Sequence, residues 1–445
     1  MGKNFLGTGA AAVLSSLAVF GFAGSAEASG PDLEAEAAIL VDAETGKIIY
    51  QDNIDVILPP ASMTKIMTEY LVHEAIEEGE ISWDQTVPIS DKVRELSHVR
   101  ALSNVPLRPD EEYTVRELYE SMAIYSANAA TIALAELISG SETEFVDKMN
   151  EKAAELGLDE YEFVNSSGLN NNSMGGLHPE GTGADAENMM SARATAKLAY
   201  NLLDEYPEVL ETASIGRKSF KEGTDDEIDM VNWNWMLPEL DLPFAYEGLD
   251  GLKTGYTDLA GNAFTATAER EDLRLISVVM RTDSREARFE ETAKLLDYGF
   301  DNYEHEEVAE EGYQIEGHET LPVSRGTESE VSISTAEPLT LLLHRNEEAD
   351  AYTPNLTING EFLDEENQLT APIEQGEVIG YIDFEYTGEN SEEYLSEQLE
   401  EAKRVPVIVN EEVEKAGWFS LGMRSIGGFF SGMWNNVADT VKGWF

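Results

Sequence analysis

The order of apolar patterns along the chain most constrains its fold: a helix-rich middle lies between an early hairpin and late strands. Residues 37–52 hold two apolar runs around a Glu-Thr-Gly turn, which predicts a β-hairpin. Helical periodicity then dominates to about residue 205. From residue 249 three β-rich runs precede an amphipathic helix over 284–300. Because both ends of this segment are β-rich, we expect one α+β domain whose sheet draws strands from both ends.

A different pattern begins at about residue 304. Short alternating runs, among them "SEVSIST", "LTLLLHR", "VIGYIDF" and "VPVIVN", are separated by turn residues. This pattern predicts a small all-β domain over residues 304–409, which follows the α+β domain over residues 29–303. With 42% hydrophobic residues in 445, the chain can bury a core in each domain.

The stretch "LPPASMTKIMTEYL", residues 58–71, starts a predicted helix with a serine three positions before a lysine. Ser62 and Lys65 lie roughly 60° apart around a helix axis at 100° per residue, so their side chains can meet. One interpretation is a nucleophile with its base. The other is a surface serine beside a lysine that pairs with Glu69, four residues on.

Two further motifs bear on this choice. Ser126-Ala127-Asn128 is the only S-x-N in the chain, and Lys253-Thr254-Gly255, on a predicted strand, is the only K-T-G. An isolated S-x-x-K is expected about once or twice by chance at this length. The three motifs in this order match the signature of the penicillin-recognising serine acyl-transfer enzymes.

On these motifs the chain resembles the D-alanyl-D-alanine carboxypeptidases, the low-molecular-weight penicillin-binding proteins. The segments "GLDGLKTGYTDLAGNAFTATA" and "FVNSSGLNN" are similar to that family as well. The resemblance implies a β-lactamase/transpeptidase-like catalytic domain, with helices flanking an antiparallel sheet. It also implies removal of the terminal D-alanine from peptidoglycan pentapeptide stems through an acyl-enzyme on Ser62, and acylation of this serine by β-lactams.

Acyl transfer assigns a role to each motif. A serine hydroxyl is a poor nucleophile until a base takes its proton. Lys65 can be that base if it is neutral, which burial and the nearby charge of Lys253 would favour by lowering its pKa. Ser126 would relay the proton to the leaving amine. Asn128 would either hold the peptide amide of the substrate or orient Lys65.

The K-T-G motif suits the C-terminal end of the substrate. Lys253 and Thr254 offer a charge and a hydrogen bond to a free carboxylate, and Gly255 leaves room for a peptide along the strand edge. The resemblance implies an oxyanion hole made by the backbone N–H groups of Ser62 and Tyr256. This chemistry needs no cofactor and no metal.

Two alternatives remain open. A class A β-lactamase shares S-x-x-K and K-T-G, but it usually carries S-D-N where this chain has S-A-N, and it lacks an appended β domain. A penicillin-sensing or wall-binding module without turnover would need no activated nucleophile, whereas Ser62, Lys65, Ser126 and Lys253 are all present. Turnover of a D-Ala-D-Ala peptide separates these interpretations.

Charge excludes one class of partner. The 29 Lys and Arg residues against 87 Asp and Glu give a net charge of -58, so nucleic acid is a poor partner. The acids are dispersed, which predicts a solvated acidic surface that suits high salt. No metal-binding motif is formed by the six histidines, of which His178 in a Gly/Asn-rich loop is the one candidate ligand: His73, His98, His178, His305, His318 and His344.

Both ends of the chain predict contact with a membrane. Residues 1–28 have the layout of a secretory signal peptide with cleavage after Ala28, the alternative being a permanent N-terminal anchor. Residues 410–445 form an amphipathic tail, and 415–445 hold three bases but one acid. We expect this tail to lie as a helix on the outer face of the cytoplasmic membrane. The alternatives are packing on the β domain or self-association.

Overall fold

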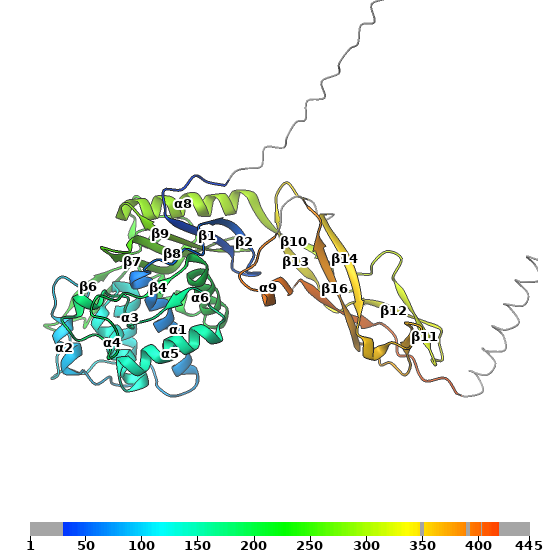
Figure 1. Ribbon diagram of the computed structural model, residues 1–445, viewed down its shortest axis with the longest axis horizontal. Coiled ribbons are helices and arrows are strands. Elements are labelled where there is room, and N and C mark those ends of the chain that lie inside the picture. The colour runs from blue at the N-terminus through cyan, green and yellow to red at the C-terminus, as the bar shows by residue number, and fades with distance from the viewer. Residues whose placement is uncertain (1–29, 348–350, 389–391, 402, 418–445) are drawn as a thin grey trace, which may run out of the picture.

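The computed structural model describes residues 30–347, 351–388, 392–401 and 403–417. These residues form a mixed α/β lobe and an elongated arm of β-strands that extends from it (Figure 1). The predicted signal peptide and the tail beyond residue 417 lie outside the described residues. Within the described ranges, no helix is both long and apolar enough to cross a bilayer.

The lobe is built on a five-stranded antiparallel sheet with the strand order β2-β1-β9-β8-β7. Strand β1 pairs with β9, so the N-terminal hairpin joins the late strands in one sheet, as the sequence predicts. The bounds are β1 (Ala37–Asp42), β2 (Ile48–Asp52), β7 (Leu249–Thr257), β8 (Gly261–Arg270) and β9 (Leu273–Thr282).

Helices cover both faces of this sheet (Figure 1). Side chains alternate along the strands: Ile39 and Val278 pack with α1 and α6, whereas Leu40 and Val279 pack with α8. The helices are α1 (Lys65–Glu77), α2 (Asp91–Ser97), α3 (Val115–Tyr125), α4 (Asn128–Ser139), α5 (Glu142–Glu155), α6 (Ala192–Glu205), α7 (Val209–Ala213) and α8 (Arg285–Asn302). Short hairpins are formed by β3 (Tyr161–Glu162) with β4 (Met189–Met190), and by β5 (Arg217–Phe220) with β6 (Ile228–Val231).

The arm begins immediately after α8 and has its own hydrophobic core. Its six-stranded sheet has the order β14-β16-β17-β12-β11-β15, and a second sheet pairs β10 with β13. The strands are β10 (Tyr303–Ala309), β11 (Thr320–Ser324), β12 (Glu330–Thr335), β13 (Leu339–His344), β14 (Tyr352–Ile358), β15 (Leu369–Thr370), β16 (Val378–Tyr386) and β17 (Arg404–Val409). The described residues of the arm also include a 3-10 helix, η5 (Gly360–Phe362), and a short α-helix, α9 (Glu397–Glu401). The fold class is therefore the predicted one, while the boundaries 29–303 and 304–409 stay predictions.

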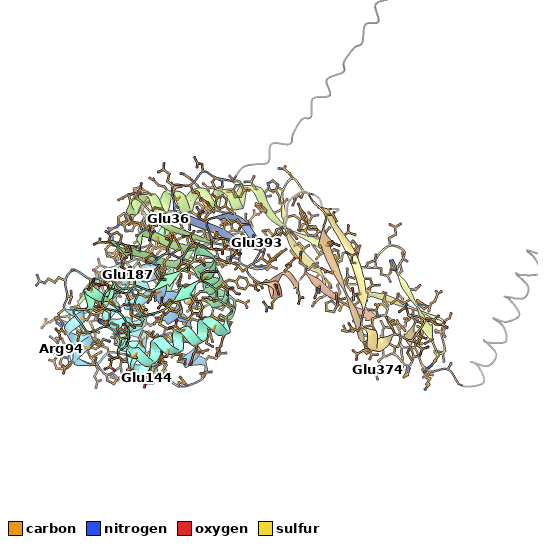
Figure 2. All side chains as sticks on the ribbon, viewed as in Figure 1. Glu36, Arg94, Glu144, Glu187, Glu374 and Glu393 are labelled. Carbon is orange, nitrogen blue, oxygen red and sulfur yellow. The ribbon has the colours of Figure 1, made fainter. Side chains whose placement is uncertain are left out.

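Acidic side chains lie on the surface of both parts (Figure 2). The labelled Glu36 and Glu144 belong to the lobe and Glu374 to the far end of the arm, and all three are exposed. This distribution places the negative charge in solvent, where water and counter-ions screen it.

Candidate active site

The serine and the lysine of the S-x-x-K motif meet at the junction of two helical segments. Ser62 lies in a short 3-10 helix, η1 (Ala61–Thr64), and Lys65 is the first residue of α1. The sequence predicts a regular helix from the prolines onward, so the 3-10 turn is a correction. Gly168 packs so closely on this turn that an added Cβ would lie 1.8 Å from the carbonyl oxygen of Ala61.

The amine of Lys65 is fully buried and has three neighbours. Its Nζ lies 3.0 Å from Ser62 Oγ, 2.8 Å from Asn128 Oδ1 and 2.6 Å from the carbonyl oxygen of Ser167. No ion pair with Glu69 occurs among the described residues, so the pairing considered from the sequence is not what the structure shows.

The S-x-N motif forms the turn between α3 and α4. Ser126 has a left-handed backbone with φ 59°, which ends α3 and lets α4 begin at Asn128. The side-chain Nδ2 of Asn128 donates to the carbonyl oxygen of Ser103 at 3.0 Å, and this contact turns the side-chain Oδ1 toward Lys65. Of the two roles expected for Asn128, the geometry matches the one that orients Lys65.

The K-T-G motif lies on the edge strand β7, which packs against η1. Lys253 is buried, with 3% of its surface exposed. A Cβ at Gly255 would lie 2.4 Å from the carbonyl oxygen of Pro60. A glycine is therefore required here because β7 approaches the segment that carries Ser62 so closely. The sequence suggested another reason, namely space for a substrate peptide along the strand edge.

A cavity of about 190 Å³ lies between these elements. Six of the eight predicted site residues line it: Ser62, Ser126, Asn128, Thr254, Gly255 and Tyr256. The two remaining predicted residues, Lys65 and Lys253, are buried and do not line it. Sequence reasoning missed several further lining residues: Ala101, Leu102, Ser103, Leu169, Trp233, Arg285 and Arg288.

Two arginines from the first turns of α8 add positive charge to this cavity. Arg288 is buried and donates to the carbonyl oxygen of Gly255 at 3.2 Å. Arg285 is exposed and its guanidinium lies 5.3 Å from the ring centre of Trp233. Because they are three residues apart at the start of a predicted helix, they would be expected on one face of it. This spacing is a sequence signal that could have identified them as a pair of cations.

Burial and mutual repulsion change the acid–base properties of the two lysines. Burial, followed by the charge of Lys253, holds the pKa of Lys65 well below its usual value, while Glu69 acts in the opposite direction. Burial also lowers the pKa of Lys253, to about 8, against the charge of Glu69 and with that of Arg288. The site therefore holds two amines whose pKa values are both lowered, and the value of about 8 leaves Lys253 mainly charged at pH 7.

His178, the candidate ligand from the sequence, contacts neighbours in its own loop. Its Nδ1 lies 3.1 Å from Thr182 Oγ1 and 3.2 Å from the carbonyl oxygen of Pro179. In the part of the chain that the structure describes, no three His, Asp or Glu side chains are grouped as metal ligands.

Comparison with known proteins agrees with this geometry. The family model of peptidase S11, D-alanyl-D-alanine carboxypeptidase, matches residues 24–284, and the model of the C-terminal domain of penicillin-binding protein 5 matches residues 303–415. D-alanyl-D-alanine carboxypeptidase DacF of Bacillus subtilis is 33% identical over 396 residues, which cover 88% of this chain and 90% of that protein.

Solved structures are similar over the same regions. PBP3, a peptidoglycan synthesis regulatory factor from Streptococcus pneumoniae, is 32% identical with a TM-score of 0.72, over 86% of this chain and all of that one. Penicillin-binding protein D2 from Listeria monocytogenes, in its ampicillin-bound form, is 33% identical with a TM-score of 0.50, over 61% of this chain and 99% of that one. The chain thus belongs to the D-alanyl-D-alanine carboxypeptidase family of serine peptidases, as its three motifs predict.

Proposed function

We propose that this protein releases the terminal D-alanine of peptidoglycan pentapeptide stems through an acyl-enzyme on Ser62. The observation that carries the proposal is the set of contacts around Lys65 Nζ. A neutral amine has two N–H donors and one lone pair. Asn128 Oδ1 and the Ser167 carbonyl oxygen accept the two donors, which leaves the lone pair for the hydroxyl of Ser62.

The reaction follows from this arrangement. Lys65 takes the hydroxyl proton of Ser62 while Ser62 Oγ attacks the carbonyl carbon of the penultimate residue of the stem peptide. The C–N bond to the terminal D-alanine breaks, and the proton reaches the leaving amine through Ser126, which lines the same cavity. Water then hydrolyses the ester by the reverse proton path.

Recognition of the substrate is electrostatic. Lys253 and Thr254 are assigned to the terminal carboxylate, with Arg288 as an additional cation behind β7. In a chain with a net charge of -58, this local positive charge favours the binding of an anionic peptide at this site. The backbone N–H groups of Ser62 and Tyr256 are assigned to the oxyanion, where losing one donor typically costs about 3 kcal/mol of transition-state stabilisation.

Labelling with a fluorescent penicillin, followed by mapping of the modified residue, tests the nucleophile. We expect the label on Ser62, and no label and no D-alanine release in Ser62→Ala. The matched control is Ser103→Ala, because Ser103 lines the same cavity but donates to the carbonyl oxygen of Tyr125; this variant should still be labelled at Ser62. A label that maps to another serine would contradict the assignment.

The same assay separates the alternative functions. A carboxypeptidase releases D-alanine from a D-Ala-D-Ala peptide and keeps penicillin as a long-lived ester. A class A-like β-lactamase would instead hydrolyse penicillin rapidly, and a sensing module would turn over neither compound. Support for β-lactam binding comes from the Listeria relative, whose structure holds ampicillin.

Localisation is part of the proposal. An exported enzyme held on the outer face of the cytoplasmic membrane by its C-terminal tail would meet its substrate in the wall. The tail should be removed from residue 418 onward, since Ala416 is buried and donates to the carbonyl oxygen of Arg325. We expect the truncated protein to be soluble, with unchanged turnover of a small peptide. Sedimentation of the truncated protein with membranes would identify the N-terminal segment as the anchor.

A further inference from the structure

One buried carboxyl group beside the catalytic lysines has no role in the reaction described so far. Glu69 lies one helical turn after Lys65 on α1, and 4% of its surface is exposed. The strand that carries Lys253 packs on η1 and α1, and the charges of Glu69 and Lys253 act on each other. Because an ionised carboxylate is costly to bury without compensation, its presence here calls for a partner.

Glu69 is connected to the surface by a row of polar side chains. Tyr119 on α3 has its hydroxyl 3.5 Å from Glu69 Oε2, the longest contact in the row, and 3.0 Å from His73 Nε2. His73 Nδ1 lies 3.2 Å from Glu208 Oε1. The side chain of His73 is 5% exposed and that of Glu208 is 52% exposed, so the row leads from the interior to solvent.

The proposed reaction creates a charge problem that Glu69 can solve. Lys65 must be neutral to act as a base, while Lys253 must be charged to bind a carboxylate; both are buried, and the charge of Lys253 acts on Lys65. Burial penalises the cation on Lys253, and buried Arg288 repels it. A single negative charge nearby compensates one cation, which leaves the second amine free to lose its proton.

We propose that Glu69 is a positioning residue for acylation: its carboxylate is the counter-charge that keeps Lys253 protonated while Lys65 is neutral, and Tyr119, His73 and Glu208 conduct its proton to solvent. The inference rests on the proposed roles of Ser62, Lys65 and Lys253. Burial raises the pKa of Glu69 to about 7, against the opposing effects of Lys253, Tyr119 and Lys65, so this group can exchange its proton near neutral pH.

The proton transfer balances along the row. In the neutral state the Glu69 hydroxyl donates to the Tyr119 oxygen, the Tyr119 hydroxyl donates to His73 Nε2, and His73 Nδ1–H donates to Glu208. When Glu69 loses its proton to Tyr119, the proton of Tyr119 moves to Nε2. The product is a carboxylate on Glu69 and an imidazolium on His73 that is paired with Glu208. His73 then releases one proton to solvent through Glu208, and every hydrogen bond near Glu69 is retained.

The groups that face this row come from several elements. The charges of Lys65 on its own helix and of Lys253 on β7 act on Glu69, and Tyr119 on α3 donates to its carboxylate. Burial lowers the pKa of His73 against the charge of Glu208, so the ring is neutral at rest and accepts a proton only in passing. Trp83, Tyr119 and Tyr206 surround the ring and exclude water from its sides.

The test is the pH dependence of the rate constant for Ser62 acylation by a fluorescent penicillin. In Glu69→Gln the counter-charge is gone, so the pKa values of Lys253 and Lys65 both fall further. We expect both limbs of the profile to move to lower pH by roughly one unit, with about a tenfold lower rate at pH 8 that recovers at lower pH.

A second variant addresses the connection to the surface. Tyr119→Phe removes the hydrogen bond that stabilises the ionised form of Glu69, so Glu69 stays neutral to higher pH and both limbs should move to lower pH, as in Glu69→Gln but by less. The control is Tyr70→Phe, because Tyr70 follows Glu69 on α1 but donates to Glu205 at 2.6 Å; both limbs should stay at the wild-type pH. Thermal unfolding confirms that each variant is folded.

The proposal is wrong if Glu69→Gln lowers the rate equally at every pH, or leaves both limbs in place, since either result makes Glu69 a packing residue. If Glu69→Gln does not fold, Tyr119→Phe decides alone, and an unmoved acid limb overturns the proposal. Failure of the proposed function is distinguishable from these outcomes, because in that case the wild-type protein itself would not be labelled on Ser62.

Discussion

Two pairs of buried lysines, one in the active site and one at the junction with the β-strand arm, show how differently this protein uses the same side chain. Lys65 and Lys253 lie in the lobe without an ion pair to a carboxylate among the described residues. At the junction, Lys47 and Lys403 both contact Glu392, at 2.6 and 3.0 Å. Lys47 also donates to the Leu342 carbonyl oxygen at 2.9 Å.

The difference between the pairs is the distance to a carboxylate. At the junction Lys47, which directly precedes β2, forms an ion pair with Glu392, and this contact connects the lobe to the arm. In the active site direct pairing would hold Lys65 as a cation and abolish its basicity. A chain with 87 acidic residues must therefore keep carboxylates from contacting these two amines. Glu69 is the only acidic side chain that acts on the charge of Lys65 in the described part of the chain.

The largest effect is expected from Lys65→Arg. An arginine cannot become a neutral base, so the exchange makes the active-site cation permanent, as at the junction. We expect D-alanine release and acylation to fall by about 10³-fold. Rate constants for both reactions, measured at several pH values, check this, and a residual rate above a tenth of wild type would show that another group is the base.

The next effect is expected from Glu392→Gln, which removes the ion pairs at the junction with the arm. Removing the shared carboxylate leaves Lys47 and Lys403 buried and charged, at a cost of about 3 kcal/mol in the free energy of unfolding. Acylation of Ser62 should be unchanged. Denaturant unfolding measures the effect, with Glu397→Gln, an exposed acid on α9, as the control.

The pH dependence of this junction has a definite sign. Burial raises the pKa of Glu392, but Lys47, Tyr352 and Lys403 outweigh it and leave the pKa below its usual value. A depressed pKa contributes stability above about pH 4.3, and this contribution is lost as the pH falls through the folded-state pKa. The difference between wild type and Glu392→Gln should therefore shrink in acid. A constant difference down to pH 3 would contradict the pairing.

A smaller effect is expected from Lys253→Arg. The variant keeps a positive charge for the substrate carboxylate, so it should retain activity, reduced by about tenfold because the fork of an arginine fits the site differently. This loss of activity should appear mainly as a higher KM for a D-Ala-D-Ala peptide, with a smaller change in kcat. Equal residual rates in Lys65→Arg and Lys253→Arg would refute the division between base and binding cation.

The smallest effect concerns His305, at the start of the arm. Burial lowers its pKa, but Asp42 at 3.2 Å and Glu44 raise it to about 8 overall. A raised pKa gives stability that is present in full below about pH 6.5 and is lost as the pH rises through about 8. We expect Tm to fall by about one or two degrees over this window. His305→Gln should abolish the dependence, whereas His98→Gln, an exposed control, should keep it.

Local patterns in the sequence were enough to predict the order of elements. The hairpin, the helix that begins near Ser62, the three strands from residue 249 and the helix after them all occur where periodicity indicates. The three motifs likewise identify five residues that line one cavity. These predictions succeed because each depends on residues a few positions apart, whose spacing fixes the side of the helix or strand on which they lie.

Contacts between distant segments could not be obtained in this way. Residue 255 must be a glycine because the carbonyl oxygen of Pro60, almost two hundred positions away in the chain, packs against it. The orientation of Asn128 depends on Ser103, and the cations Arg285 and Arg288 reach the cavity from a helix that the motifs do not include. Such contacts exist only after the strands have paired, because no local spacing encodes which segments become neighbours.

The sequence by itself determined which groups are available for acyl transfer and on which elements they lie. Only the tertiary structure decided their ionisation. Glu69 is the clearest case: four residues from Lys65, it suggested a surface ion pair, yet packing of α3 and β7 against α1 buries it and directs it toward Tyr119. Whether an amine or carboxyl carries charge depends on the water excluded around it and on the charges within a few ångströms, and both are properties of the packed chain.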